Sequence, residues 1–184
     1  MSTIITDLSD LRGITDTHRV LVVEGARGAG KDHLIQRLPV ENRRVVYEPL
    51  HPRRDHTSNG RSGEAEAPLD LDIQQASFWV FDFLRQAPPD LTVTLNRSML
   101  SSMFWDGPRP DRLELWGLML KALGGVVIMV NPVPKEHRRR LGLEGRSGEW
   151  NSVTRERQVI TDAAHQLPKE LVVWFSESPA EEVV

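Results

Sequence analysis

A glycine-rich segment near the start of the chain carries the clearest chemical signal. Residues 20–23 form an apolar run, and after Glu24 residues 25–31 follow with the spacing G-x-x-x-x-G-K. A strand that enters such a loop and a helix that leaves it aim backbone N–H groups at one point, where the lysine adds a mobile positive charge. The pattern predicts a polyphosphate-binding loop and favours it over a turn without a ligand. Its residues are Gly25, Ala26, Arg27, Gly28, Ala29, Gly30, Lys31 and Asp32.

The composition limits the classes of function. The 184 residues include no cysteine and carry a net charge of -3. Disulfides, thiolate metal sites and thiol nucleophiles are therefore excluded, and the charge argues against a generally basic nucleic-acid binder. The sequence has no run of about 18 apolar residues and no basic-then-apolar start. We therefore expect a cytoplasmic protein with neither a membrane span nor a signal peptide.

Short apolar runs separated by helical patterns predict an α/β protein. Five such runs alternate with helices, which is typical of a parallel sheet covered on both faces. We expect a single domain over residues 1–184 with a five-stranded parallel sheet flanked by helices. The predicted strands lie at residues 20–23, 45–47, 91–95, 126–130 and 171–175.

The segments between the strands differ in regularity. We predict one helix over residues 72–84 and another that begins with Asp111 as N-cap and stops at Gly124-Gly125. Residues 51–68, rich in Pro, Arg, Ser and Gly, predict a loop. Residues 141–152 contain three glycines and resemble a lid between two helices. Residues 1–18 show no clear role.

Four further polar segments follow predicted strands in order. They are Tyr47-Glu48-Pro49, residues 96–107, residues 131–134 and the arginine-rich residues 135–157. Ligands bind at the carboxyl ends of strands in open α/β sheets. Together with the glycine-rich loop, these segments predict one site built from distant parts of the chain.

These motifs resemble the thymidylate kinase and deoxynucleoside kinase group of P-loop kinases. Those families carry E-G-x-D-G-x-G-K-[ST], then E-P, then [DE]-R-[SY]-x-x-S-S-x-x-[YF]-x-G, then D-V-P-P and an arginine-bearing lid. The likeness covers about residues 19–183. It implies a P-loop NTPase fold with strand order 2-3-1-4-5 and the cofactors ATP and Mg²⁺.

The resemblance also implies roles for individual residues. Lys31 and the loop backbone would hold the donor phosphates, and Arg97 would touch the transferring or acceptor group. Glu48 would contact the acceptor sugar or activate a hydroxyl. Lid arginines would neutralise charge during transfer, and aromatic residues would either stack on a base or pack in the core. The lid arginines are Arg138, Arg139, Arg140 and Arg146, the aromatic residues are Phe78, Trp79 and Trp105, and Ser101 lies in the third motif.

Four positions depart from the family pattern. Asp32 replaces the hydroxyl that holds Mg²⁺, and Asn96 replaces an acidic residue that faces the same ion, so a carboxylate has either moved between two walls of the site or been lost. Tyr47 stands where thymidylate kinases place an arginine on the acceptor phosphate. Arg27 replaces an acid that reads a free 3′-hydroxyl, and a cation there prefers a phosphate. The last two changes favour a hydroxyl acceptor on a nucleoside or on a modified base in DNA.

Three functions are consistent with these features. The leading hypothesis is an ATP-dependent phosphotransferase that acts on a nucleoside, nucleotide or related hydroxyl acceptor. The narrower alternative is a kinase of 5-hydroxymethyluracil bases in DNA, as in phage DNA modification. A P-loop protein that binds nucleotide without catalysis is the third. The oligomeric state stays open, with a homodimer as one option.

Overall fold

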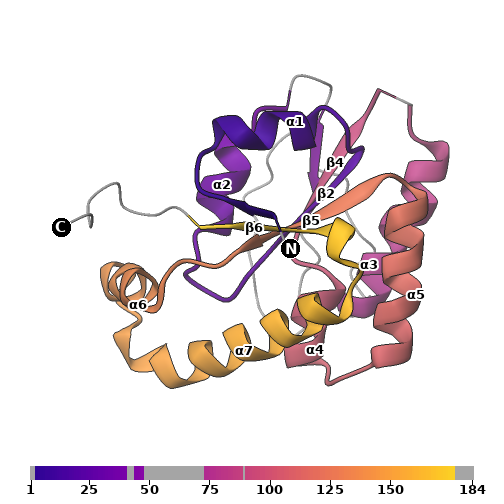
Figure 1. Ribbon diagram of the computed structural model, residues 1–184. Helices are drawn as coiled ribbons and strands as arrows, with labels where there is room; N and C mark the ends of the chain where they lie inside the picture. The colour runs from indigo at the N-terminus through magenta and orange to yellow at the C-terminus, as the bar shows by residue number, and fades with distance from the viewer. Residues whose placement is uncertain (1–2, 41–43, 48–72, 89, 177–184) are drawn as a thin grey trace.

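Six parallel strands form one sheet in the computed structural model, which describes residues 3–40, 44–47, 73–88 and 90–176. Along the sheet the order is β1-β6-β5-β2-β4-β3, and each neighbouring pair is parallel (Figure 1). The strands are β1 (Thr3–Ile5), β2 (Val20–Glu24), β3 (Arg44–Tyr47), β4 (Thr92–Asn96), β5 (Gly125–Val130) and β6 (Val172–Phe175).

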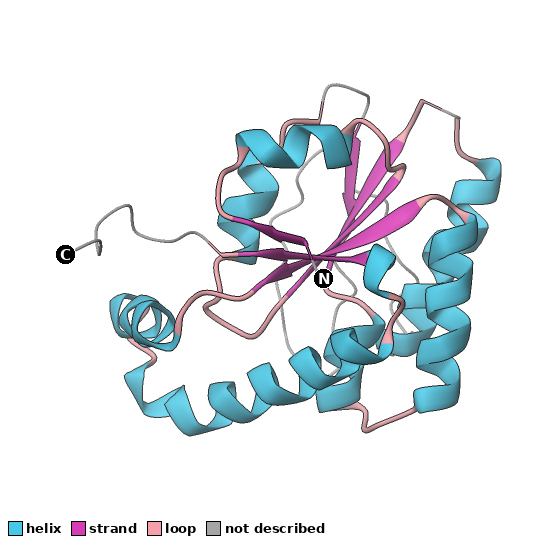
Figure 2. Ribbon diagram, viewed as in Figure 1, coloured by secondary structure: helices cyan, strands magenta, loops and turns pink. Residues whose placement is uncertain are grey.

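Helices cover both faces of this sheet (Figure 2). The longer ones are α3 (Ile73–Gln86), α5 (Pro110–Ala122), α6 (Pro134–Leu143) and α7 (Trp150–Gln166), and the shorter ones are α1 (Arg12–Thr15), α2 (Lys31–Arg37) and α4 (Met99–Trp105). Single 3₁₀ turns lie at Ser9–Leu11, Ser147–Glu149 and Lys169–Leu171. None of the helices in the described ranges is long and apolar enough to cross a membrane.

The central strand β2 shows why the predicted strands are apolar throughout. Val20 and Val22 face one hydrophobic cluster, together with residues of α3, α4, α5 and α7. Leu21 and Val23 face a second cluster on the opposite side, which includes residues of α2 and β1. Successive side chains of a strand point to opposite faces, so a sheet covered on both faces needs apolar residues at every position.

All five predicted strands form, in the expected order, but the expected count of five is wrong. The N-terminal segment adds a sixth strand, β1, at the edge beside β6, with Ile5 in register with Phe175. Three residues are too few to show a periodic pattern. Their pairing also depends on a strand about 170 positions away in the sequence.

Several helix boundaries also differ from the sequence-based expectation. Helix α5 begins at Pro110, so Asp111 lies in its first turn and Arg109 is the N-cap. Most of residues 141–152 is ordered secondary structure at the end of α6, in a 3₁₀ turn and at the start of α7. The predicted loop at residues 51–68, and Asp72, lie outside the described residues.

Strand β1 offers a matched pair of substitutions that test its place in the sheet. Ile5 is buried in the second cluster, whereas the side chain of Ile4 is 70% exposed. We expect Ile5→Ala to lower the free energy of unfolding by about 2–5 kcal/mol, because it leaves a cavity. Ile4→Ala should change it by no more than about 0.5 kcal/mol. Equal, small effects in urea denaturation would show that β1 does not belong to the folded core.

Candidate functional site

The glycine-rich loop, residues 25–30, lies tightly between β5 and α6. Gly25 and Gly28 have φ angles of 149° and 71°, which L side chains rarely adopt. A Cβ atom on Gly25 would lie 2.5 Å from the Val130 carbonyl oxygen, and one on Gly28 would lie 2.6 Å from a methyl of Leu141. The glycines are thus required by the backbone conformation and by the close approach of both neighbours.

Lys31 is the first residue of α2 and is buried against this loop. Its ammonium donates hydrogen bonds to the carbonyl oxygens of Gly25, at 2.8 Å, and Ala26, at 3.1 Å. Burial, and then the nearby charge of Arg97, lower the pKa of Lys31 to about 8. The side chain therefore remains a cation at neutral pH, and its hydrogen-bond partners among the described residues are neutral carbonyl groups that an incoming anion can replace.

Asp32 and Asn96 meet across the site, as the sequence analysis expects. The Asn96 amide donates a 2.7 Å hydrogen bond to Asp32 Oδ1. Its own carbonyl oxygen, Oδ1, is buried without a hydrogen-bond partner in the described part of the chain. The described residues contain no group of three or more His, Cys, Asp or Glu able to hold a metal ion. A carboxylate beside a bare amide oxygen nevertheless suits Mg²⁺, which takes few protein ligands when phosphates and waters supply the rest.

These residues open onto a cavity of about 310 Å³ at the carboxyl edge of the sheet. Its volume falls within the range of ligand-binding clefts. The cavity brings together eight predicted site residues from three separate parts of the sequence. Those residues are Arg27, Gly28, Gly30, Lys31, Asp32, Asn96, Arg97 and Arg146, and the remaining lining residues are His33 and Glu144.

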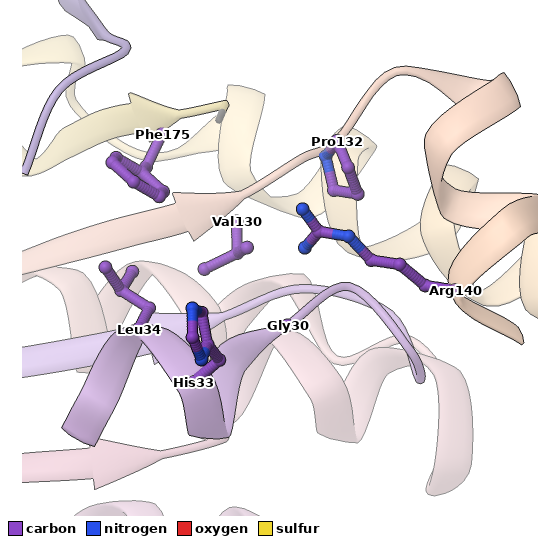
Figure 3. A pocket seen from close by; sticks show the side chains of 7 residues that line it. All are labelled: Gly30, His33, Leu34, Val130, Pro132, Arg140 and Phe175. Carbon is purple, nitrogen blue, oxygen red and sulfur yellow. The ribbon is translucent and has the colours of Figure 1, made fainter. Parts of the chain in front are cut away.

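A smaller, mostly apolar hollow adjoins the loop near Gly30 (Figure 3). Its volume of about 10 Å³ is enough for one water molecule. Arg140 reaches from α6 toward Pro132 and Gly30, and its guanidinium donates a 2.8 Å hydrogen bond to the Ala29 carbonyl oxygen. The space beside Gly30 is thus filled by Arg140, and a Cβ atom on Gly30 would overlap its guanidinium.

Arg97 has an uncommon backbone conformation at the edge of the cavity. It is the one residue other than glycine with a positive φ among those described, at 79°. Its backbone N–H donates to the Val23 carbonyl oxygen, and its guanidinium lies 3.3 Å from Glu156 Oε1. Such a conformation persists only where the surrounding structure holds it, and it is found most often at functional sites.

Arg27 lines the cavity, but its guanidinium is already paired with the 3₁₀ turn at Ser147–Glu149 and with α7, so a DNA phosphate at this position would have to compete with these partners. Its side chain contacts Glu156 at 2.6 Å, Glu149 at 2.8 Å and Ser152 at 2.7 Å. Its guanidinium also lies 5.1 Å from the ring centre of Trp105, within cation–π distance. Arg27 thus pairs with residues of α7 and lies over the ring of Trp105.

The lid arginines occupy different environments. Arg146 lines the cavity and binds both carboxylate oxygens of Glu149, which raises its pKa. Arg138 is exposed and lies over the Trp150 ring at 5.8 Å, so the structure does not bring it to the cavity. Arg139 and Arg140 both donate to Glu136, and these hydrogen bonds lower the pKa of that carboxyl to about 2.

The proposed substrate-binding residues are only partly brought to the site. The Ser101 hydroxyl is buried and donates a 2.7 Å hydrogen bond to Glu24, so it supports the loop and does not face the cavity. Phe78 packs against the hydrophobic core beside Phe81. The side chain of Trp79, and Glu48 as a whole, lie outside the described residues.

Three buried polar residues escaped the sequence analysis. Glu24 accepts hydrogen bonds from Ser98 and Ser101, and Glu156 pairs with two arginines. His137 contacts the Arg27 carbonyl oxygen through Nε2 at 2.7 Å, while burial lowers its pKa. A signal existed only for Glu24, which matches the first residue of the family's E-G-x-D-G-x-G-K-[ST] motif.

No protein-family model matches the chain, and no curated protein was found that matches it.

The packing of the loop against α6 can be tested with two glycines of equal φ. Gly28 and Gly145 both have a φ of 71°, but a Cβ atom on Gly145 would meet open space. Gly145→Ala should lower the free energy of unfolding by about 1–2 kcal/mol through backbone strain alone. Gly28→Ala should cost about 1–3 kcal/mol more, because buried Leu141 must move. Equal losses in chemical denaturation would contradict the close packing.

Proposed function

We propose that this protein is an ATP-dependent kinase that transfers the γ-phosphate to a hydroxyl or phosphate group of a nucleoside, nucleotide or related acceptor. The single observation that carries the proposal is the convergence of Lys31, Asp32, Asn96 and Arg97 on one cavity beside the glycine-rich loop. The parallel sheet with helices on both faces is compatible with a P-loop NTPase-like fold.

The donor would bind where the loop and Lys31 meet. The loop leads directly into α2, and Lys31 stands at the start of that helix. A helix N-terminus and a lysine cation both favour a polyphosphate. The Lys31 ammonium, which contacts two loop carbonyls in the ligand-free protein, would turn to the phosphates.

Asp32 and Asn96 fit the Mg²⁺ ion that accompanies ATP. The support is chemical: Asp32 offers an exposed carboxylate, and the buried Asn96 Oδ1 lacks a partner in the described residues. A bound Mg²⁺ would neutralise charge on the phosphate oxygens. The family pattern has its acidic residue at the position of Asn96, on β4, whereas this chain has its carboxylate at Asp32, on α2. This is the arrangement we expect if the carboxylate that faces the ion had changed position between the two elements.

Arg97, which lines the cavity, would stabilise charge during transfer. In the reaction an acceptor oxygen bonds to the γ-phosphorus, the bond from that phosphorus to the bridging oxygen breaks, and ADP leaves. A proton from an acceptor hydroxyl passes to a base. The family resemblance implies either this role or contact with the acceptor sugar for Glu48, which lies outside the described residues. Such reactions require mainly positioning and positive charge.

A transfer screen with radiolabelled ATP tests this function. The acceptors are nucleosides, nucleoside monophosphates and DNA that contains 5-hydroxymethyluracil. We expect one class to be labelled, and Lys31→Ala should reduce its labelling at least about a hundredfold, by loss of a charge-stabilising group. The control is Lys121→Ala, since Lys121 pairs with Glu170 on the surface. Labelling that persists in Lys31→Ala would contradict the kinase proposal, and ATP binding without any labelling would favour a non-catalytic protein.

A magnesium titration tests the displaced carboxylate. If Asp32 supports the ion, Asp32→Asn should sharply raise the Mg²⁺ concentration needed for half-maximal rate. Asp32→Thr combined with Asn96→Asp should restore activity better than either single change, with a coupling energy of about 0.5–3 kcal/mol. Asp162→Asn, at an exposed position of α7, is the control. Additive effects would count against two residues that share one ion.

A further inference from the structure

Glu156 is a fully buried carboxylate whose two oxygens contact two arginines from different parts of the chain. Its Oε2 lies 2.6 Å from Arg27 Nε, and its Oε1 lies 3.3 Å from Arg97 Nη1. Arg27 belongs to the glycine-rich loop, and Arg97 follows β4. One side chain of α7 thus joins the loop to the arginine at the edge of the cavity.

The two contacts differ in strength, and this difference gives them different roles. Arg27 is buried and also binds Glu149 and Ser152, so it anchors the Glu156 carboxylate firmly. Arg97 is partly exposed toward the cavity, at 17%, and its contact with Glu156 is longer. Glu156 is the carboxylate that pairs with Arg97 within the described residues. Arg97 can therefore bind an anion in the cavity while Glu156 stays in place.

We infer that Glu156 is a positioning residue for phosphoryl transfer, which holds Arg97 toward the cavity while Arg27 anchors it to the glycine-rich loop. The inference rests on the proposed function. Without this carboxylate, two guanidinium groups would lie near each other at the site with less compensating charge, and Arg97 would turn away. A displacement of about 1 Å in such a group is enough to slow a reaction about a hundredfold.

The test compares Glu156→Gln with the wild type in steady-state kinetics and in ATP binding by calorimetry. We expect kcat to fall about tenfold to a hundredfold, while KM and the affinity for ATP change much less. Glu156→Asp, which keeps the charge but shortens the side chain, should lose less activity than Glu156→Gln. Glu170→Gln, at the exposed partner of Lys121, should match the wild type.

A double-mutant cycle with Arg97→Ala separates positioning from a general loss of stability. If Glu156 acts through Arg97, the double variant should be no slower than Arg97→Ala alone. Wild-type kcat in Glu156→Gln, or additive losses in the cycle, would overturn the inference. If Glu156→Gln does not fold, the cycle is run with Glu156→Asp, whose smaller loss should likewise disappear in the Arg97→Ala background. A wild type that labels no acceptor contradicts the proposed function itself, whereas a wild type that labels one and a Glu156→Gln variant that matches it contradict only the inference.

Discussion

The ion pairs of Arg27, above all the buried pair with Glu156, hold the glycine-rich loop in place, and the geometry of the site depends on them. Arg27 has three polar partners on the 3₁₀ turn at Ser147–Glu149 and α7, namely Glu149, Ser152 and Glu156. Buried charges are costly unless they are paired and hydrogen-bonded, so each partner is needed by the other. The loop therefore has one preferred position relative to α7. This position fixes where the loop atoms that line the cavity lie.

Helix α6 holds the same loop from another side. His137 contacts the Arg27 carbonyl oxygen, and Arg140 donates to the carbonyl oxygen of Ala29. Both contacts use backbone carbonyls of a loop whose glycines allow close approach.

The cations around the cavity are balanced by carboxylates of the protein itself. Arg97 pairs with Glu156, Arg146 pairs with Glu149, and Lys31 contacts carbonyl groups with Glu24 and Asp32 nearby. A polyphosphate would have to compete with these internal partners. The weakest of these interactions are the hydrogen bonds of Lys31 to neutral carbonyls and the longer contact of Arg97 with Glu156. An anion would replace these two with the smallest loss of free energy.

The sequence by itself determined the positions of the central strands and of the glycine-rich loop. These follow from local rules, since buried strands are apolar at every position and a glycine-rich turn with a lysine joins a strand to a helix. The order of the strands in the sheet and the proximity of Asp32 to Asn96 were expected only from the resemblance to P-loop kinases. The tertiary structure alone decided that Arg27 points to α7, that Ser101 supports Glu24, that Arg138 lies away from the cavity and that Thr3–Ile5 pairs with β6. Arg27 and Glu156 are 129 positions apart. The partner of a long polar side chain depends on which distant helix packs beside it, and no periodicity within a short segment carries that information.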